Sequence, residues 1–83
     1  MSFFVYLLIT KQKNKLISYV GYTSNLQKRL KLHNTSKGAK FTKGRKWKLA
    51  YSKRYKTKSL AMIEEIKLKN NYKLRKKIKK NFN

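Results

Sequence analysis

The stretch FFVYLLIT, residues 3 to 10, contains the longest apolar run of this chain. It consists almost entirely of β-branched, aromatic and aliphatic residues, which favour a β-strand. Both sets of alternate positions are apolar, as expected for a strand that is covered on its two faces. We therefore predict a central strand with helices packed on at least one face of its sheet.

A second strand follows this one after a short polar segment. LISYVGY, residues 16 to 22, has a similar composition, and the intervening KQKNK is a good hairpin connection. A hairpin centred on this connection places Tyr6 within about one residue of directly opposite Tyr19. The two phenols would then share one small site, although strand tyrosines more often bury the ring and leave the hydroxyl at the surface.

A third strand is predicted later in the chain. WKLAYSKRY, residues 47 to 55, alternates two sets of side chains with the period of a strand. One predicted face carries Trp47, Leu49 and Tyr51. The other carries Lys48, Ala50 and Ser52.

Three helices complete the prediction. In TSNLQKRLKLHN, capping residues precede leucines at helical spacing, which predicts a helix over about residues 25 to 33. Thr57 or Ser59 can cap a second helix that runs to about Lys69. The last helix has one apolar face, formed by Leu74, Ile78 and Phe82.

The predicted order is β-β-α-β-α-α, a small α/β fold in which helices flank a three-stranded antiparallel sheet. We expect one domain over residues 1–83, with a core at about 3–69 and a basic C-terminal helix at about 71–80. The chain has no Cys, so a disulfide or a thiolate zinc site is excluded and the fold rests on packing.

Charge is the strongest signal in the composition. The chain has 24 Lys plus Arg against 2 Asp plus Glu, a formal net charge of +22. Self-repulsion on this scale is relieved by a polyanion, so we expect a nucleic acid partner. An anionic membrane and ribosomal RNA are rival partners. An A·T-rich genome would also produce many lysines, but it does not account for the near absence of acids.

The apolar segment at the N-terminus does not predict a membrane protein. FFVYLLIT is far shorter than the roughly 20 residues that cross a bilayer, and no Lys or Arg precedes it as in a signal peptide. We expect a soluble, cytoplasmic protein that makes no use of a membrane.

Two pairs of residues are candidates for chemistry. Arg29 and His33 lie four apart in a predicted helix, so they share a face and could converge on a phosphate. A solvated cation and a histidine at a helix end are the ordinary alternative. Glu64 and Glu65 are the only carboxylates, and helical angles do not tell which points inward; contacts with nearby lysines would be their ordinary role.

Several separated blocks together resemble the GIY-YIG nuclease domain, in particular its small stand-alone bacterial members. The blocks are VYLL, YVGYTSNLQKRLKLHN, GAKFTKGRKWKLAY and AMIEEIKLK, and they span about residues 4–69 in the family's order and spacing. The second motif is kept as Tyr19-Val20-Gly21. The first departs from Gly-Ile-Tyr, but its tyrosine falls on Tyr6. The spacing from Ala61 and Lys69 selects Glu65 as the family's metal-binding glutamate.

The resemblance implies a metal-dependent endonuclease that hydrolyses phosphodiester bonds in DNA, with a structure-specific role in repair or recombination. Mg²⁺ or Mn²⁺ would be held by Glu65. Tyr19 or Tyr6 would activate the attacking water, its pKa lowered by nearby positive charge. His33 would position or deprotonate a tyrosine hydroxyl, and Arg29 would stabilise the transition state.

Further cations are expected to hold flanking phosphates without reading bases: Lys40, Lys43, Arg45 and Lys69. A protein partner that supplies specificity is compatible with a nuclease of this size, and RNA is an open alternative substrate. The competing interpretation is a non-catalytic, basic nucleic-acid-binding protein with the same fold, which would have no need of Glu65.

Overall fold

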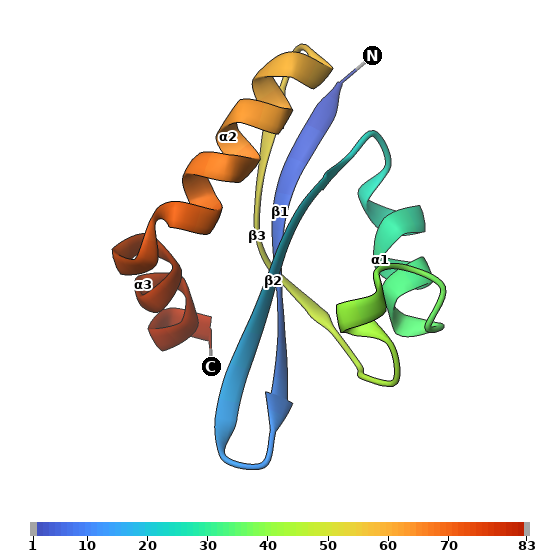
Figure 1. Ribbon diagram of the computed structural model, residues 1–83, viewed down its shortest axis with the longest axis vertical. Helices are drawn as coiled ribbons and strands as arrows, with labels where there is room; N and C mark the ends of the chain where they lie inside the picture. The colour runs from blue at the N-terminus through green and yellow to red at the C-terminus, as the bar shows by residue number, and fades with distance from the viewer. Residues whose placement is uncertain (1, 83) are drawn as a thin grey trace.

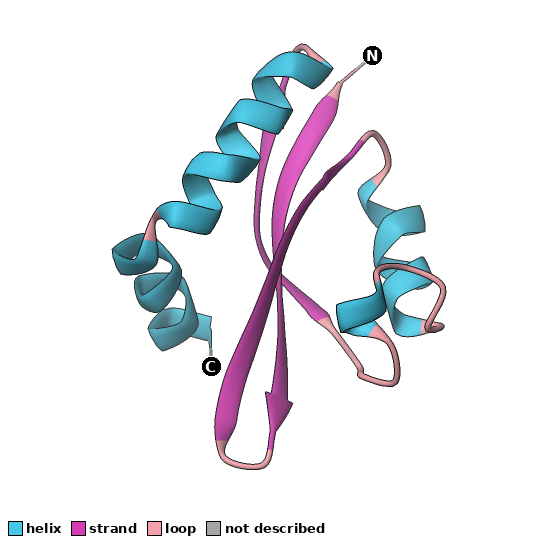
Figure 2. Ribbon diagram, in the orientation of Figure 1, coloured by secondary structure: helices cyan, strands magenta, loops and turns pink. Residues whose placement is uncertain are grey.

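The computed structural model describes residues 2–82. The elements follow the predicted order, with one additional short 3₁₀ helix, η1 (Figures 1 and 2). They are β1 (Phe3–Gln12), β2 (Lys15–Thr23), α1 (Leu26–Asn34), η1 (Lys40–Thr42), β3 (Lys48–Tyr55), α2 (Lys58–Asn70) and α3 (Tyr72–Phe82). The three strands form one antiparallel sheet in the order β2-β1-β3, which confirms the predicted fold class.

Strand β1 is the centre of the sheet and is covered on both faces, as the sequence predicts. Helices α2 and α3 lie on one side of the sheet, and α1 with η1 lies on the other (Figure 1). Val5, Leu7 and Ile9 are buried towards the first side, in a cluster with residues of α2 and α3. Tyr6 and Leu8 are buried in a separate cluster with Trp47 on the second side. The strand period of two thus separates two cores.

The hairpin register differs slightly from the prediction. Tyr6 pairs with Gly21, and Tyr19 pairs with Leu8, so the two tyrosines are offset by two residues on the same face. The cause is the turn, which is centred between Lys13 and Asn14 rather than on the middle of the KQKNK segment. Lys13 adopts a positive φ of 54° in this turn.

The alternation predicted for the third strand is wrong in part, because a β-bulge interrupts it. Leu7 pairs with Tyr51 and Leu8 with Leu49, which leaves Ala50 as the extra residue of β3. Ala50 and Tyr51 therefore both pack against the α2 and α3 side. Leu49 is exposed instead of sharing a buried face with Trp47 and Tyr51.

The helices begin where the sequence predicts. Asn25 caps α1 by accepting a hydrogen bond from the Lys28 amide, and Thr57 caps α2 by accepting one from the Leu60 amide. Helix α3 places Leu74, Ile78 and Phe82 against the sheet cluster of Val5, Leu7 and Ile9. Within residues 2–82, no helix is both long and apolar enough to span a bilayer.

Candidate active site

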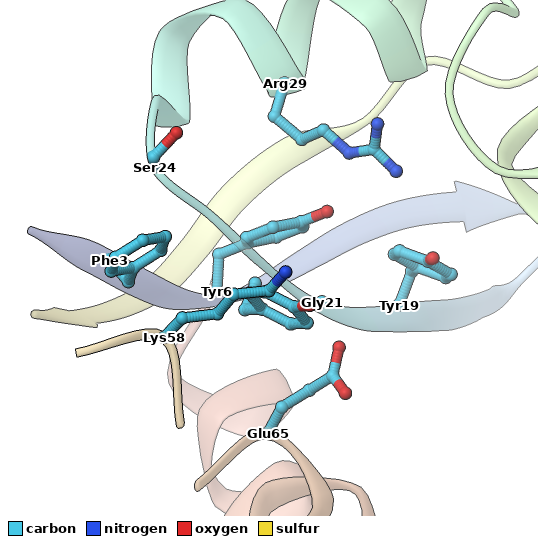
Figure 3. Close-up of a pocket in the computed structure, with 9 residues that line it drawn as sticks. Phe3, Tyr6, Tyr19, Gly21, Ser24, Arg29, Lys58 and Glu65 are labelled. Carbon is cyan, nitrogen blue, oxygen red and sulfur yellow. The ribbon is translucent and has the colours of Figure 1, made fainter. Parts of the chain in front are cut away.

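An open pocket of about 370 Å³ lies beside β2, an edge strand of the sheet. Four of the five predicted catalytic residues line it, and they come from four different elements: Tyr6 from β1, Tyr19 from β2, Arg29 from α1 and Glu65 from α2. In Figure 3, Arg29 and Glu65 extend from their helices towards the space between the two tyrosines. Both sides of the sheet therefore contribute to one pocket.

Gly21 makes room for the central tyrosine of this pocket. A Cβ on Gly21 would lie 2.6 Å from Cζ of Tyr6, a distance that real Cβ atoms do not show. The Tyr6 ring is itself 2 % exposed and cannot easily move away. Any side chain at position 21 would therefore displace the phenol that Gly21 faces across the hairpin.

His33, the fifth predicted residue, lies behind the pocket. It is fully buried, which rules out the alternative of a histidine that decorates a helix end. Its Nε2 lies 2.9 Å from the Tyr6 hydroxyl, and its Nδ1 lies 2.7 Å from the Thr42 hydroxyl. The hydroxyl of Thr42 donates its proton to the carbonyl of Ala39 at 2.8 Å.

This chain of hydrogen bonds fixes the direction of each proton. Since the Thr42 hydroxyl donates to Ala39, it must accept from His33, so Nδ1 of His33 carries the ring proton. Nε2 is then an unprotonated acceptor, and the Tyr6 hydroxyl donates to it. Tyr6, not Tyr19, is thereby connected to a base.

The surroundings hold Thr42 and His33 in place. The Trp47 indole N–H donates to the carbonyl of Thr42 at 3.0 Å, and Asn34 clamps the backbone of Trp47 by accepting from its amide and donating to its carbonyl. Gly38 lies against the imidazole so closely that a Cβ would collide with Nδ1 of His33. The loop between α1 and β3 is thus built around the buried ring.

Burial sets the pKa values of the two bonded groups. It raises the pKa of the Tyr6 phenol above its usual 10.0, and the opposing effect of the Arg29 guanidinium is smaller. This corrects the expectation of a tyrosine with a lowered pKa, at least for Tyr6. Burial also lowers the pKa of His33 below 6.5, and the charge of Arg29 acts in the same direction. His33 is therefore a neutral acceptor at pH 7.

Tyr19 occupies the other side of the pocket without a bond to His33. Its ring centroid lies 6.5 Å from that of Tyr6 and 5.1 Å from the imidazole. On its outer side it stacks on Phe41, with centroids 6.1 Å apart and planes 20° apart. Tyr19 thus connects the pocket to the loop that carries η1.

The two glutamates have different surroundings. Glu65 lines the pocket with 16 % of its side chain exposed, and Oε1 lies 3.6 Å from the ammonium of Lys69. Glu64 is not among the residues that line the pocket, and it forms a closer ion pair with Lys67, at 3.1 Å. Lys69, expected to hold a phosphate, is therefore the neighbour of Glu65.

A divalent ion of the kind that the family uses is compatible with Glu65. Residues 2–82 contain no group of three or more His, Cys, Asp or Glu side chains that would enclose a metal. Mg²⁺ needs no such group, because it keeps several waters and takes one or two carboxylates together with a substrate phosphate. The long contact to Lys69 leaves the Glu65 oxygens able to accept a cation. The donor set fits a single Mg²⁺ or Mn²⁺.

Three polar residues of the pocket lining were missed by the sequence analysis as functional groups: Tyr22, Ser24 and Lys58. Ser24 and Lys58 line the pocket beside Tyr6 and Arg29 (Figure 3). Lys58 is the first residue of α2, and no local pattern distinguishes it from the other lysines. Thr42 stands within the GAKFTKGR block, but its bond to His33 became visible only from the fold.

The remaining predicted cations lie outside this pocket lining. Lys40 is exposed at the start of η1, and Lys43 and Arg45 follow it in the loop before β3. Lys43 and Arg45 line a second pocket. The structure therefore separates these cations from the Tyr6 pocket.

The fold and the pocket together define a class, a small α/β protein whose phenols, guanidinium and carboxylate surround one open site. The family model for the GIY-YIG catalytic domain matches residues 2–79, and the chain belongs to this family of nucleases. A nuclease domain has a nucleic acid as its substrate.

Within the family, the chain is similar to small bacterial proteins named UPF0213. It is 43% identical to the UPF0213 protein of Oceanobacillus iheyensis over 80% of this chain and 74% of that protein. It is 45% identical to the UPF0213 protein of Bacillus velezensis over 82% of this chain and 67% of that protein. It is 42% identical to the UPF0213 protein of Staphylococcus haemolyticus over 77% of this chain and 78% of that protein. No solved structure matches the chain significantly.

Proposed function

We propose that this protein is a divalent-metal-dependent endonuclease that hydrolyses phosphodiester bonds in DNA. One observation carries the proposal: the only buried imidazole accepts the hydroxyl proton of Tyr6, beside a pocket that also holds Arg29 and Glu65. This arrangement offers a proton acceptor, a cation and an acidic ligand around one space large enough for a phosphate.

Tyr6 and His33 serve as a proton relay. A water molecule in the pocket gives a proton to the Tyr6 oxygen as the Tyr6 hydroxyl proton passes to Nε2 of His33. Because Tyr6 loses and gains a proton together, its raised pKa is no obstacle. The water oxygen forms the new bond to phosphorus, and the bond to the leaving ester oxygen breaks. The leaving oxygen takes a proton from solvent, and His33 then returns its proton to solvent through the Tyr6 hydroxyl.

Arg29 and Lys58 act on charge. Arg29 enters the pocket from α1 and stabilises the negative charge that grows on the phosphate oxygens. Lys58 enters from the start of α2 and holds the phosphate or the leaving oxygen. Both cations are positioned by helices, so they need little rearrangement when the substrate binds.

Glu65 would hold Mg²⁺ or Mn²⁺. The bound ion supplies a Lewis acid that polarises the phosphate and neutralises charge. Glu65 has the lower exposure of the two glutamates and lines the pocket, whereas Glu64 is paired with Lys67. Lys69, with its ammonium 3.6 Å from Oε1, orients the Glu65 carboxylate that would hold the ion.

We further propose that the protein acts on particular DNA structures in repair or recombination. The cations of this chain contact phosphates rather than base edges, which gives affinity without sequence preference. Selection among nicked, branched and single-stranded DNA then depends on the shape of the strand at the pocket. Cleavage of a panel of labelled DNA structures measures this preference.

The test of the function compares two variants that differ by one position. In a plasmid-nicking assay with Mg²⁺ or Mn²⁺, we expect Glu65→Gln to abolish cleavage, because the amide lacks the charge that a hard cation requires. Glu64→Gln makes the same change in net charge and retains cleavage. DNA binding without metal persists or tightens in both variants, since a negative charge has been removed.

Three outcomes contradict parts of the proposal. Equal cleavage by the two variants removes Glu65 from the metal site. Loss of cleavage in Glu64→Gln alone assigns the site to the neighbouring carboxylate. A wild-type protein that binds DNA but cleaves none of the panel with either metal is the non-catalytic nucleic-acid-binding protein.

A further inference from the structure

A second concave surface lies at the opposite end of β1 from the Tyr6 pocket. It consists of two adjoining pockets of about 500 Å³ and 210 Å³, which share Thr10, Lys11 and Lys46. We call it the basic groove, and its cations are Lys11, Lys43, Arg45, Lys46 and Lys48. Thr10 lies four positions after Tyr6 in β1, which corresponds to about 13 Å.

No acidic side chain of residues 2–82 lines the basic groove. The two side-chain carboxylates, Glu64 and Glu65, are both on α2 and lie outside this lining. Five cations that converge on one concave surface repel one another, and an anion placed among them relieves the repulsion. The lining therefore favours a ligand with several negative charges.

Arg45 is held in place for such a ligand. Its guanidinium lies over the ring of Phe41, 5.0 Å from the centroid, and Phe41 in turn stacks on Tyr19 of the Tyr6 pocket. This contact holds the guanidinium near the ring, and the planar guanidinium offers several N–H donors to a phosphate. Its Nη1 is buried and has no hydrogen-bond partner within residues 2–82, so the other guanidinium N–H groups are the ones that would contact a ligand.

The loop that carries Lys43 and Arg45 turns at Gly44. Gly44 stands between Lys43 and Arg45 with a φ of 78°, a conformation that favours glycine, and its amide donates to the Ser36 hydroxyl at 3.0 Å. Nothing lies within 4 Å of the Cβ that another residue would carry there. The turn thus presents the two neighbouring cations without covering the space between them.

We propose that the basic groove binds the backbone phosphates of duplex DNA on one side of the cleaved bond. The separation of about 13 Å from Tyr6 corresponds to about four base pairs at 3.4 Å each. The stack of Tyr19, Phe41 and Arg45 joins the two sites. The assignment of DNA as the ligand of the basic groove rests on the proposed function. The binding of phosphates does not depend on it, because binding needs no cleavage.

The test is a binding experiment without metal, in which no cleavage occurs. The full chain is titrated into a labelled duplex of about 20 base pairs, which exceeds the 37 Å long axis of the molecule. The groove variant is Lys43→Gln/Arg45→Gln/Lys46→Gln. The control variant is Lys73→Gln/Lys76→Gln/Lys80→Gln, which removes the same charge from exposed positions of α3.

We expect the groove variant to bind about tenfold or more weakly than the control at moderate salt. The slope of log K against log[salt] should fall by about 2.7 for three phosphates at about 0.9 each, and by less than about one in the control. Circular dichroism checks folding, and Lys11→Gln/Lys46→Gln repeats the test without touching the Arg45 stack. Equal losses in the groove and control variants overturn the proposal.

Two further arms separate the outcomes. Tighter binding of an RNA duplex of the same length assigns the groove to RNA and overturns the proposal for DNA. If wild type binds DNA through the groove but never cleaves it, the proposed function fails and the groove stands. If wild type cleaves DNA and the groove variants bind as the control does, the groove fails and the function stands.

Discussion

The two faces of the sheet are built from alternate residues of one strand, yet they differ in chemistry. Val5, Leu7 and Ile9 face a cluster of aliphatic and aromatic side chains from α2 and α3. Tyr6 faces a histidine and a threonine that are fully buried, together with Trp47. The first face gains stability by excluding water. The second buries polar groups, and each requires a partner.

A small chain must supply enough free energy of folding to support a site that contains buried polar groups. Buried polar groups cost free energy unless their hydrogen bonds are made, so the aliphatic face must supply the surplus. The Tyr6 pocket lies at the edge strand β2, where Arg29 reaches it from one side of the sheet and Glu65 from the other. The aliphatic face therefore supplies most of the stability and the other face holds the buried polar groups. Only at the edge strand β2 do residues from both sides of the sheet line one pocket.

The largest effect is expected on the aliphatic face. Leu7 has no exposed surface, so Leu7→Ala should lower the free energy of unfolding by about 2–5 kcal/mol through lost burial and a cavity. Urea denaturation followed by circular dichroism measures it. Leu49→Ala is the control, because Leu49 is 41% exposed and should cost less than about 1 kcal/mol. Equal costs would mean that this face carries no special share of the stability.

The next effect tests the chemical side. Arg29→Ala should reduce turnover about 10²–10³-fold, or about 2.7–4 kcal/mol, with a much smaller loss of DNA affinity, since its contact strengthens in the transition state. Cleavage rates at saturating DNA and binding isotherms separate the two. Lys28→Ala, an exposed cation one residue earlier in α1, should change both little. The same loss from both substitutions would remove Arg29 from the site.

A smaller effect is expected from Thr42, which we regard as a positioning residue. Thr42→Val leaves Nδ1 of His33 without a partner and removes one of the two hydrogen bonds to the Ala39 carbonyl, which should cost about 1–3 kcal/mol of stability. Because the ring proton is no longer fixed on Nδ1, cleavage should also slow, and its pH profile should shift. Thr42→Ser should restore both.

Thr35→Val is the matched control for Thr42→Val, since Thr35 is exposed and water can replace its partner. A Thr42→Val protein that loses stability but keeps the wild-type pH profile would show that Thr42 only supports the loop.

The smallest effect is a pH dependence. The folded pKa of His33 is lowered, so the unfolded chain binds the proton more readily. Stability is then fully present above about pH 6.5 and falls as the pH drops towards the folded pKa, by at most about 1.4 kcal/mol per pH unit. Cleavage should show an acid limb with an apparent pKa below 6.5, because protonated His33 cannot accept from Tyr6.

His33 is the only histidine, so His33→Gln removes imidazole titration from the chain. Unfolding measured between about pH 5 and 8 should then lose its dependence on this group. A wild-type curve that matches that of His33→Gln would contradict the neutral, buried imidazole.

The sequence by itself determined the order of the elements. FFVYLLIT is apolar at every alternate position, so a strand covered on both faces was the only favourable arrangement, and capping residues set where α1 and α2 begin. These signals are local, because strand and helix periods depend on neighbouring residues. Composition likewise determined the charge of +22 and the expectation of a polyanionic partner.

Only the tertiary structure decided which of these residues meet. The bulge at Ala50, the bond between Tyr6 and His33, and the different surroundings of Glu64 and Glu65 all depend on contacts between distant segments. The helical positions of two adjacent glutamates do not show which one lines a pocket. The packing of α2 beside the sheet places Glu65 in the pocket lining. The physical reason is that the sequence period determines which face of its own helix or strand a side chain occupies. Tertiary packing determines which other residues contact that face.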